Sequence, residues 1–421
     1  MKKIIGLAIA AAFGLSACSN LDHKTAHEVM SISNDRILKE DHSFNITGSS
    51  RVYISPLAEA VLADEKVEEK AKAEVEDAKA KAEDAMAKAE DAAASMEVAQ
   101  EDDAALKQEF SEREEAEFRN AMLDALPDGN IAQVAVDYLD KYPAISSYME
   151  GVHLNYESAV DLSTRQFELI PELAINNHNE KLSIKLPMKL DAEKWEIYID
   201  PPASAAAIIS VYTDEKIGKR LIKEPLKLSL KEIGDSKHMP FDHIAEAGGR
   251  AFLSANKAMP ADAYVFKEMD AFGKANHARY RVRHVMKPEY DSVVMKAMAK
   301  AFDEELSKLQ KTPQPGSTEE DYKNAREFFS MSVNISDNQP LSFQRIFGNN
   351  LVVDYYLDRK GRMLASRMYM QINGTHKAIN IIGDSVYSNY GKPVFKLNPQ
   401  GKGITWKELK EFFSSNKKED D

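Results

Sequence analysis

The residues that could do chemistry are few and far apart. Cys18 is the only cysteine in 421 residues, so an intrachain disulfide and a thiolate-held metal cluster are both excluded. The histidines that lie close in sequence are His23 and His27, His238 and His243, and His277 and His284. The first pair has helical spacing but no third ligand in view, and the other two lack the spacing of a zinc protease. We therefore expect exposed linker histidines in the first pair, structural histidines elsewhere, and no catalytic residue, metal or cofactor.

The N-terminus has the pattern of an export signal. Lys2 and Lys3 precede an apolar run over 4–15, followed by Leu15-Ser16-Ala17-Cys18, and this run is too short to cross a membrane. The tetrapeptide resembles the lipobox of bacterial lipoproteins. That resemblance implies cleavage before Cys18, diacylglycerol on its sulfur and acylation of its new amino group. A buried cysteine near a helical N-terminus is the alternative.

The same resemblance implies a location. In this family an aspartate after the cysteine often signals retention in the inner membrane, and this chain has Ser19 there. We therefore expect a lipid anchor in the outer membrane, with several acyl chains giving durable attachment.

A second local resemblance concerns a serine. Ile381-Ile382-Gly383-Asp384-Ser385 resembles the serine block of GDSL-type hydrolases, in which a catalytic Asp and His follow far downstream. No histidine follows His376, so the base that a serine nucleophile needs is missing in that order. We expect a turn between strands at Gly-Asp-Ser.

The longest uninterrupted pattern runs from Leu57 to Leu126, between Pro56 and Pro127, without an internal Gly or Pro. Small apolar residues recur there with four-three spacing: Ala71, Val75, Ala78, Ala82, Ala85, Ala89, Ala92, Met96 and Ala99. A seven-residue period in a sequence rich in Ala, Glu and Lys predicts a long helix with a coiled-coil seam. Periodicity does not report partners, so a homo-oligomer through this seam and a single or back-packed helix stay open. Either is a spacer.

Charge separates this helix from the rest of the chain. Residues 64–118 hold 8 of the 55 basic and 20 of the 68 acidic residues, which leaves 47 and 48 elsewhere. A nearly neutral remainder lacks the basic surface that nucleic acids require, so we expect no nucleic-acid partner.

The remainder has mixed periodicity. Residues 130–170 are predicted as helices, with apolar positions at Tyr138, Leu139, Tyr142, Ile145 and Tyr148. From Lys181 to Leu190 apolar and polar residues alternate, which predicts a half-buried strand. Further strands are expected at Trp195–Ile199, Ala207–Tyr212 and Leu226–Leu230, forming an antiparallel meander.

Later segments alternate between helix and strand. We expect helical structure over 241–275, a strand at Arg279–Met286, and a helix opened by Pro288 with one apolar face. Members of that face are Tyr290, Val294, Ala297, Met298, Ala301, Phe302, Leu306 and Leu309. Met295 and Met298 are expected to fill core space rather than to bind a metal.

The last hundred residues contain the clearest hairpin. Leu351–Leu357 and Met363–Ile372 flank the turn sequence Asp358-Arg359-Lys360-Gly361. Segments 378–382 and 394–397 are expected to extend the sheet. Thr405 and Glu408 have the spacing of a capping box that starts a final helix.

These patterns predict an α+β fold in successive parts. The expected parts are a signal peptide at 1–17, a lipidated flexible tether at 18–54, the long helix at 55–127, and α+β regions at 128–312 and 317–416, separated by the Pro- and Gly-containing break at 312–317.

Two functions remain open. The favoured one is a lipid-anchored, non-enzymatic envelope protein that binds or scaffolds an envelope protein partner. Its anchor and spacer resemble the helical murein-associated lipoproteins, without their C-terminal cross-linking lysine, since this chain ends Glu419-Asp420-Asp421. The alternative is a lipid-anchored hydrolase whose site combines distant residues.

Overall fold

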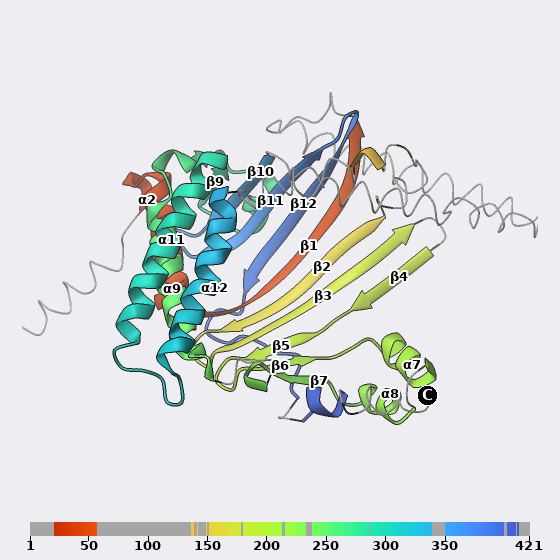
Figure 1. The fold of residues 1–421 in the computed structure, drawn as a ribbon. Helices are drawn as coiled ribbons and strands as arrows, with labels where there is room; N and C mark the ends of the chain where they lie inside the picture. The colour runs from red at the N-terminus through yellow and green to blue at the C-terminus, as the bar shows by residue number, and fades with distance from the viewer. Residues whose placement is uncertain are drawn as a thin grey trace, which may run out of the picture. The chain divides into compact units, whose positions relative to one another are not determined.

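The computed structural model describes residues 21–56, 136–138, 141, 149, 151–177, 180–212, 215–232, 238–285, 287–338, 350–399, 402–409 and 411. It confirms an α+β fold (Figure 1). The strands are β1 Ser43–Pro56, β2 Val152–Asp161, β3 Gln166–Asn177, β4 Glu180–Lys185, β5 Met188–Asp191, β6 Glu196–Ile199, β7 Leu226–Ser229, β8 Tyr264–Lys267, β9 Tyr280–Val285, β10 Asn350–Leu357, β11 Met363–Asn373, β12 Lys377–Ser388 and β13 Ile404–Thr405. The α-helices are α2 Ala26–Lys39, α7 Ala203–Tyr212, α8 Glu215–Leu221, α9 Phe241–Ala258, α10 Ala271–Ala275, α11 Pro288–Leu309 and α12 Glu319–Asn338.

The chain divides into two compact units. The first comprises residues 1–54, 143–371 and 380–421, and the second comprises 55–142 and 372–379. Cys18 and the whole seam from Ala71 to Ala99 lie outside the described residues. No helix among the described residues is long and apolar enough to cross a membrane.

One sheet organises the first unit. In the described part of the chain its thirteen strands follow the order β13-β7-β6-β5-β3-β2-β1-β12-β11-β10-β9-β8, with β4 also paired to β3. The meander from β2 through β7 is antiparallel, as expected from its short connections, and β13 adds to β7 in parallel.

The expected tether at 18–54 is folded from Leu21 onward. Thr25 caps α2 through a capping box, in which its hydroxyl accepts from the Glu28 backbone and the Glu28 side chain accepts from the Thr25 backbone. Val29 and Met30 of this helix are buried against β8 and the strands beside it. The burial of Val29 and Met30 therefore places part of the expected tether in the hydrophobic core.

Several other secondary-structure predictions are wrong, among them the helical prediction for 241–275, in which residues 264–267 form strand β8. Residues 152–170, which belong to the segment 130–170 that we expected to be helical, form β2 and the first part of β3. Their apolar residues alternate with polar ones, which is the strand period, whereas the helical prediction rested on tyrosines that precede them. Residues 207–212, expected as a strand, belong to α7, where a run of alanines favours helix and a short apolar run does not distinguish the two.

Three helices form a layer around one apolar cluster. Ala247 and Ala251 of α9 meet Phe302 and Leu306 of α11 and Tyr322 of α12, and Figure 1 shows the three helices lying together. The apolar face predicted for the helix from Pro288 therefore lies inside, as expected. The break at 312–317 is the loop that joins α11 to α12, and both helices belong to the first unit.

The C-terminal hairpin is confirmed. β10 pairs with β11 antiparallel, with an irregularity between Tyr356 and Leu357. The turn closes at Gly361, whose φ of +79° is a left-handed conformation that glycine adopts without strain. The capping box at the final helical segment is also present, because Thr405 and Glu408 exchange side-chain-to-backbone hydrogen bonds.

The described residues of the second unit are few. The Asp137 carboxylate accepts hydrogen bonds from the Thr375 backbone (2.7 Å) and the Thr375 hydroxyl (3.0 Å). Val136 lies so close to Gly374 that a β-carbon there would come within 2.5 Å of it, so this turn needs glycine.

Candidate binding surface

Strand register places apolar side chains on one face of β2, β3 and the two strands β4 and β5, which both pair with β3. Directly paired residues point to the same side of a sheet, and alternate residues along a strand share that side. Four rows of three result: Val152, Ile175 and Leu182; Leu154, Leu173 and Ile184; Tyr156, Pro171 and Leu186; Ser158, Leu169 and Met188. We call these twelve residues the apolar sheet face.

This face is open to solvent. Leu154, Leu173 and Ile184 form one row across three strands and are 45%, 43% and 40% exposed. Leu169, Leu182 and Leu186 are exposed on the same face. Single exposed apolar residues are ordinary, but six in adjacent rows make a contiguous patch of the kind that marks a binding surface.

The two polar side chains of the face are already engaged. The Tyr156 ring lies over Gly48 of β1, where a β-carbon would come within 2.3 Å of it. Its hydroxyl reaches Ser385 of β12 at 2.5 Å, and the Ser158 hydroxyl donates to the Glu168 carbonyl. The face therefore presents hydrocarbon and aromatic surface to a ligand.

The turn that we expected at Gly-Asp-Ser is not present in the structure. Gly383, Asp384 and Ser385 lie inside β12, not between strands. Asp384 accepts two hydrogen bonds from Arg367 of β11, at 2.6 and 3.0 Å, and Ser385 bonds to Tyr156 rather than to a histidine. The motif is thus used for cross-strand pairing.

The opposite face of these strands is polar. Glu157, Glu172 and Lys185 lie there, and Lys185 pairs with Glu172 at 3.5 Å. Buried Glu168 accepts hydrogen bonds from the backbone amides of Lys396 and Leu397. Residues 394–397, expected as a strand, are therefore held on this face by a carboxylate and do not form a strand.

A buried ionic cluster stabilises the sheet farther along the polar face. Asp354 of β10 accepts from Arg281 at 2.6 and 3.0 Å and from Arg283 at 2.7 and 2.9 Å. The Asp354 side chain is fully buried, and those of Arg281 and Arg283 are 11% and 13% exposed. The segment around α10 adds Asp270, 3.2 Å from Arg281. All carboxylate and guanidinium groups of this cluster are paired, which suits a structural role.

The histidines lie in separate environments. His284 of β9 packs on Tyr264, with ring centroids 4.7 Å apart, and burial lowers the pKa of its imidazole to about 4. His27, expected as an exposed linker residue, is half-buried, and its ring centroid lies 5.9 Å from that of Tyr264. His243 bonds to the Tyr322 hydroxyl at 2.5 Å. His277 lies before β9, and His284 lies within it.

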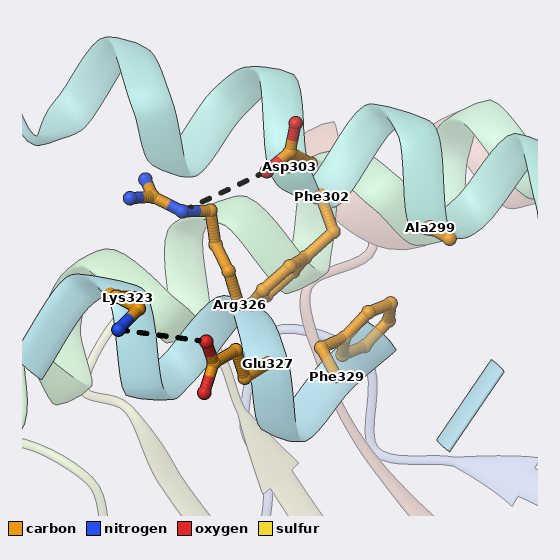
Figure 2. Close-up of a pocket in the computed structure, with 7 residues that line it drawn as sticks. All are labelled: Ala299, Phe302, Asp303, Lys323, Arg326, Glu327 and Phe329. Atoms are coloured by element: carbon orange, nitrogen blue, oxygen red, sulfur yellow. Dashed lines mark ion pairs between the residues drawn. The ribbon is translucent and has the colours of Figure 1, made fainter. Parts of the chain in front are cut away.

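A hollow of about 460 Å³ lies between α11 and α12 (Figure 2). Its floor holds Phe302 and Phe329, whose rings stack 4.0 Å apart. Arg326 lies 3.8 Å from Asp303, and Lys323 lies 3.9 Å from Glu327, at its rim. The charged side chains of this hollow are paired with one another.

The apolar sheet face is thus the strongest candidate site among the described residues. Most of this face was not predicted from the sequence, because β2 and part of β3 fall within the segment 130–170 that we expected to be helical. The alternation of apolar and polar residues from Val152 to Val160 was the signal that could have revealed it. Within the same residues no group of three or more acidic, histidine or cysteine side chains is placed to hold a metal. Comparisons with protein-family models, curated proteins and solved structures find no match to this chain.

Proposed function

We propose that this protein is a lipid-anchored component of the bacterial cell envelope that binds an extended apolar ligand on its apolar sheet face and does not act as a catalyst. The observation that carries the binding role is the exposed row formed by Leu154, Leu173 and Ile184, with further exposed leucines in the rows beside it. An antiparallel sheet in water normally turns such a face toward a core.

The chemistry of the face favours a hydrocarbon chain as the ligand. None of its twelve residues is charged, and the hydroxyls of Tyr156 and Ser158 are already bonded. Neighbouring strands lie about 4.8 Å apart and alternate residues about 6.8 Å apart, so four rows of three cover about 20 by 10 Å. A long acyl chain fits such a strip, whereas a charged ligand would lose hydration there without gaining a partner.

The anchor and the spacer are proposals from sequence. The lipobox-like Leu15-Ser16-Ala17-Cys18 supports lipid attachment at Cys18 and an outer-membrane location. The seven-residue alanine period of 57–126 supports a helical spacer that associates with a second copy through its seam. Cells fed labelled palmitate should label the wild type and not Cys18→Ser. Light scattering should give an oligomer for the intact chain and a monomer without residues 57–126.

The binding role is tested with the chain that begins at residue 18 and carries Cys18→Ser, which contains every residue that the structure describes. A fluorescent long-chain fatty acid serves as the probe. Leu173→Lys places a cation in the middle row of the face, and it should weaken binding roughly tenfold or more, the equivalent of losing one buried leucine contact.

Asn176→Lys is the matched control, because Asn176 is exposed on the same strand but on the polar face. It should bind the probe as the wild type does. Equal binding by the two variants, or no binding by the wild type, would refute the proposal.

A further inference from the structure

Strand β4 has an open edge. Among the described residues it pairs only with β3, and Figure 1 shows it at the border of the sheet. Every side chain from Lys181 to Leu186 is exposed, on both faces of the strand. A sheet edge presents unpaired backbone N–H and C=O groups that another strand can join. The edge of β4 is therefore a candidate contact surface in addition to the apolar sheet face.

The strand register decides which backbone groups of β4 face outward. The Leu186 amide donates to the Pro171 carbonyl of β3. In an antiparallel pair, residues that bond across the pair alternate with residues that do not, so the even-numbered residues of β4 direct their backbone groups to β3. The odd-numbered residues direct theirs to the outer edge; they are Lys181, Ser183 and Lys185. Each of them offers one N–H donor and one C=O acceptor to another backbone.

The side chains of β4 differ between its two faces. The apolar ones lie on the apolar sheet face and are exposed: Leu182, Ile184 and Leu186. The opposite face carries Lys181 and Lys185, with Glu172 of β3 beside them. The Glu172 carboxylate accepts from the Ser183 hydroxyl and lies 3.5 Å from the Lys185 ammonium, and both contacts lower the pKa of its carboxyl. Lys181 makes no ion pair with another described residue. This edge is therefore apolar on one face and cationic on the other.

We propose that the outer edge of β4 binds an extended segment of a partner protein in which apolar and acidic residues alternate. The backbone of this segment bonds to the outward groups of β4 and adds a strand to the sheet, as in other complexes formed by strand addition. Residues directly opposite in an antiparallel pair share a face. Apolar side chains of the partner therefore lie beside Leu182 and Ile184, and acidic ones lie beside Lys181 and Lys185.

Charge selects this partner over a second copy of the chain. Two β4 strands paired antiparallel would place the lysines of both copies on the same face, and like charges on paired strands are destabilising. The hydrocarbon chain proposed for the apolar sheet face would leave the outward backbone groups without hydrogen bonds. The edge therefore serves a second ligand, and this inference does not rest on the proposed function.

The test is fluorescence anisotropy with the labelled peptide Gly-Glu-Val-Thr-Val-Glu-Gly, blocked at both ends, and the chain from residue 18 with Cys18→Ser. The wild type should bind this peptide, with the peptide threonine opposite Ser183 and a glutamate opposite each lysine. N-methylation of the threonine removes a donor directed at β4 and should lower the affinity roughly tenfold or more. N-methylation of a valine is the matched control, because its amide points away from β4 and its loss should change the affinity little.

Two variants of the protein test the edge itself. Ser183→Pro removes an outward N–H at a position where an edge strand tolerates proline, and it should lower the affinity for the peptide roughly tenfold. Lys181→Glu should also weaken binding of this peptide and should strengthen binding of the charge-reversed peptide Gly-Lys-Val-Thr-Val-Lys-Gly. Lys257→Glu is the matched control, because it reverses an exposed lysine on α9, and it should bind both peptides as the wild type does.

The two binding proposals fail separately. Leu173→Lys should lose the fatty acid and keep the peptide, and Ser183→Pro should do the reverse. Strand addition would be overturned by absence of wild-type binding, by equal binding of the threonine-methylated peptide, or by equal binding of the two peptides of opposite charge. An oligomer in light scattering that Ser183→Pro converts to a monomer would also overturn it, because the edge would then join copies of the chain.

Discussion

Replacing Asp354 by alanine should strongly destabilise the first unit. The change removes the acceptor of four hydrogen bonds from Arg281 and Arg283, which range from 2.6 to 3.0 Å. Both guanidinium groups are almost buried, so neither regains its hydration when the carboxylate is lost. Breaking a buried ion pair by removing one partner costs about 3–5 kcal/mol.

The measurement is urea unfolding followed by a signal of the first unit, together with the thermal midpoint. At about 2–4 °C per kcal/mol, a loss of that size lowers the midpoint by roughly 6–20 °C. Asp354→Asn keeps the shape of the side chain and one oxygen acceptor, so it should lose less stability than Asp354→Ala. Asp270 lies 3.2 Å from Arg281 and retains part of that arginine's pairing in both variants.

Asp303→Ala is the control. Asp303 is 65% exposed and its ion pair with Arg326 spans 3.8 Å, and exposed pairs of this kind contribute about 0–1 kcal/mol. A loss below about 1 kcal/mol for Asp354→Ala, matching the control, would refute the reasoning. It would mean that water replaces the carboxylate and that the cluster is not sealed by the segment around α10.

Two further predictions concern the stability of the fold at acidic pH and the N-terminal cap of α2. His284 is buried against Tyr264, and burial lowers its pKa from 6.5 to about 4. Between pH 6.5 and 4, the imidazole is therefore protonated in the unfolded chain but neutral in the folded chain. The free energy of unfolding should be highest above pH 6.5 and should decline by up to about 3 kcal/mol as the pH falls toward 4. In His284→Phe the urea midpoint should depend less on pH across this range. An unchanged pH dependence in this variant would contradict the assignment of the effect to His284. Thr25→Ala removes the capping box of α2 and should cost about 1 kcal/mol, whereas Lys39→Ala, which breaks only an exposed ion pair of the same helix, should change the urea midpoint little. Equal losses in the two α2 variants would count against the cap.

The sequence alone determined those elements whose signal is local and long. The helix from Pro288 extends over 22 residues, so its apolar period repeats often enough to separate helix from strand. The hairpin around Gly361 and the capping box at Thr405 were predictable because turn and cap chemistry depends on a few adjacent residues. Fold class followed from these elements.

Only the tertiary structure determines which side chains form the apolar sheet face. Leu154, Leu173 and Ile184 are far apart in sequence, and only strand register brings them into one row. The segment over 203–212 contains alanine and β-branched residues in a run too short for its period to be read, and in the structure it forms α7, which packs against α8. Likewise, Asp354 meets Arg281 and Arg283 across more than 70 residues. Sequence periodicity identifies which side of an element is apolar, but the pairing of distant elements decides which of those sides remains exposed for binding.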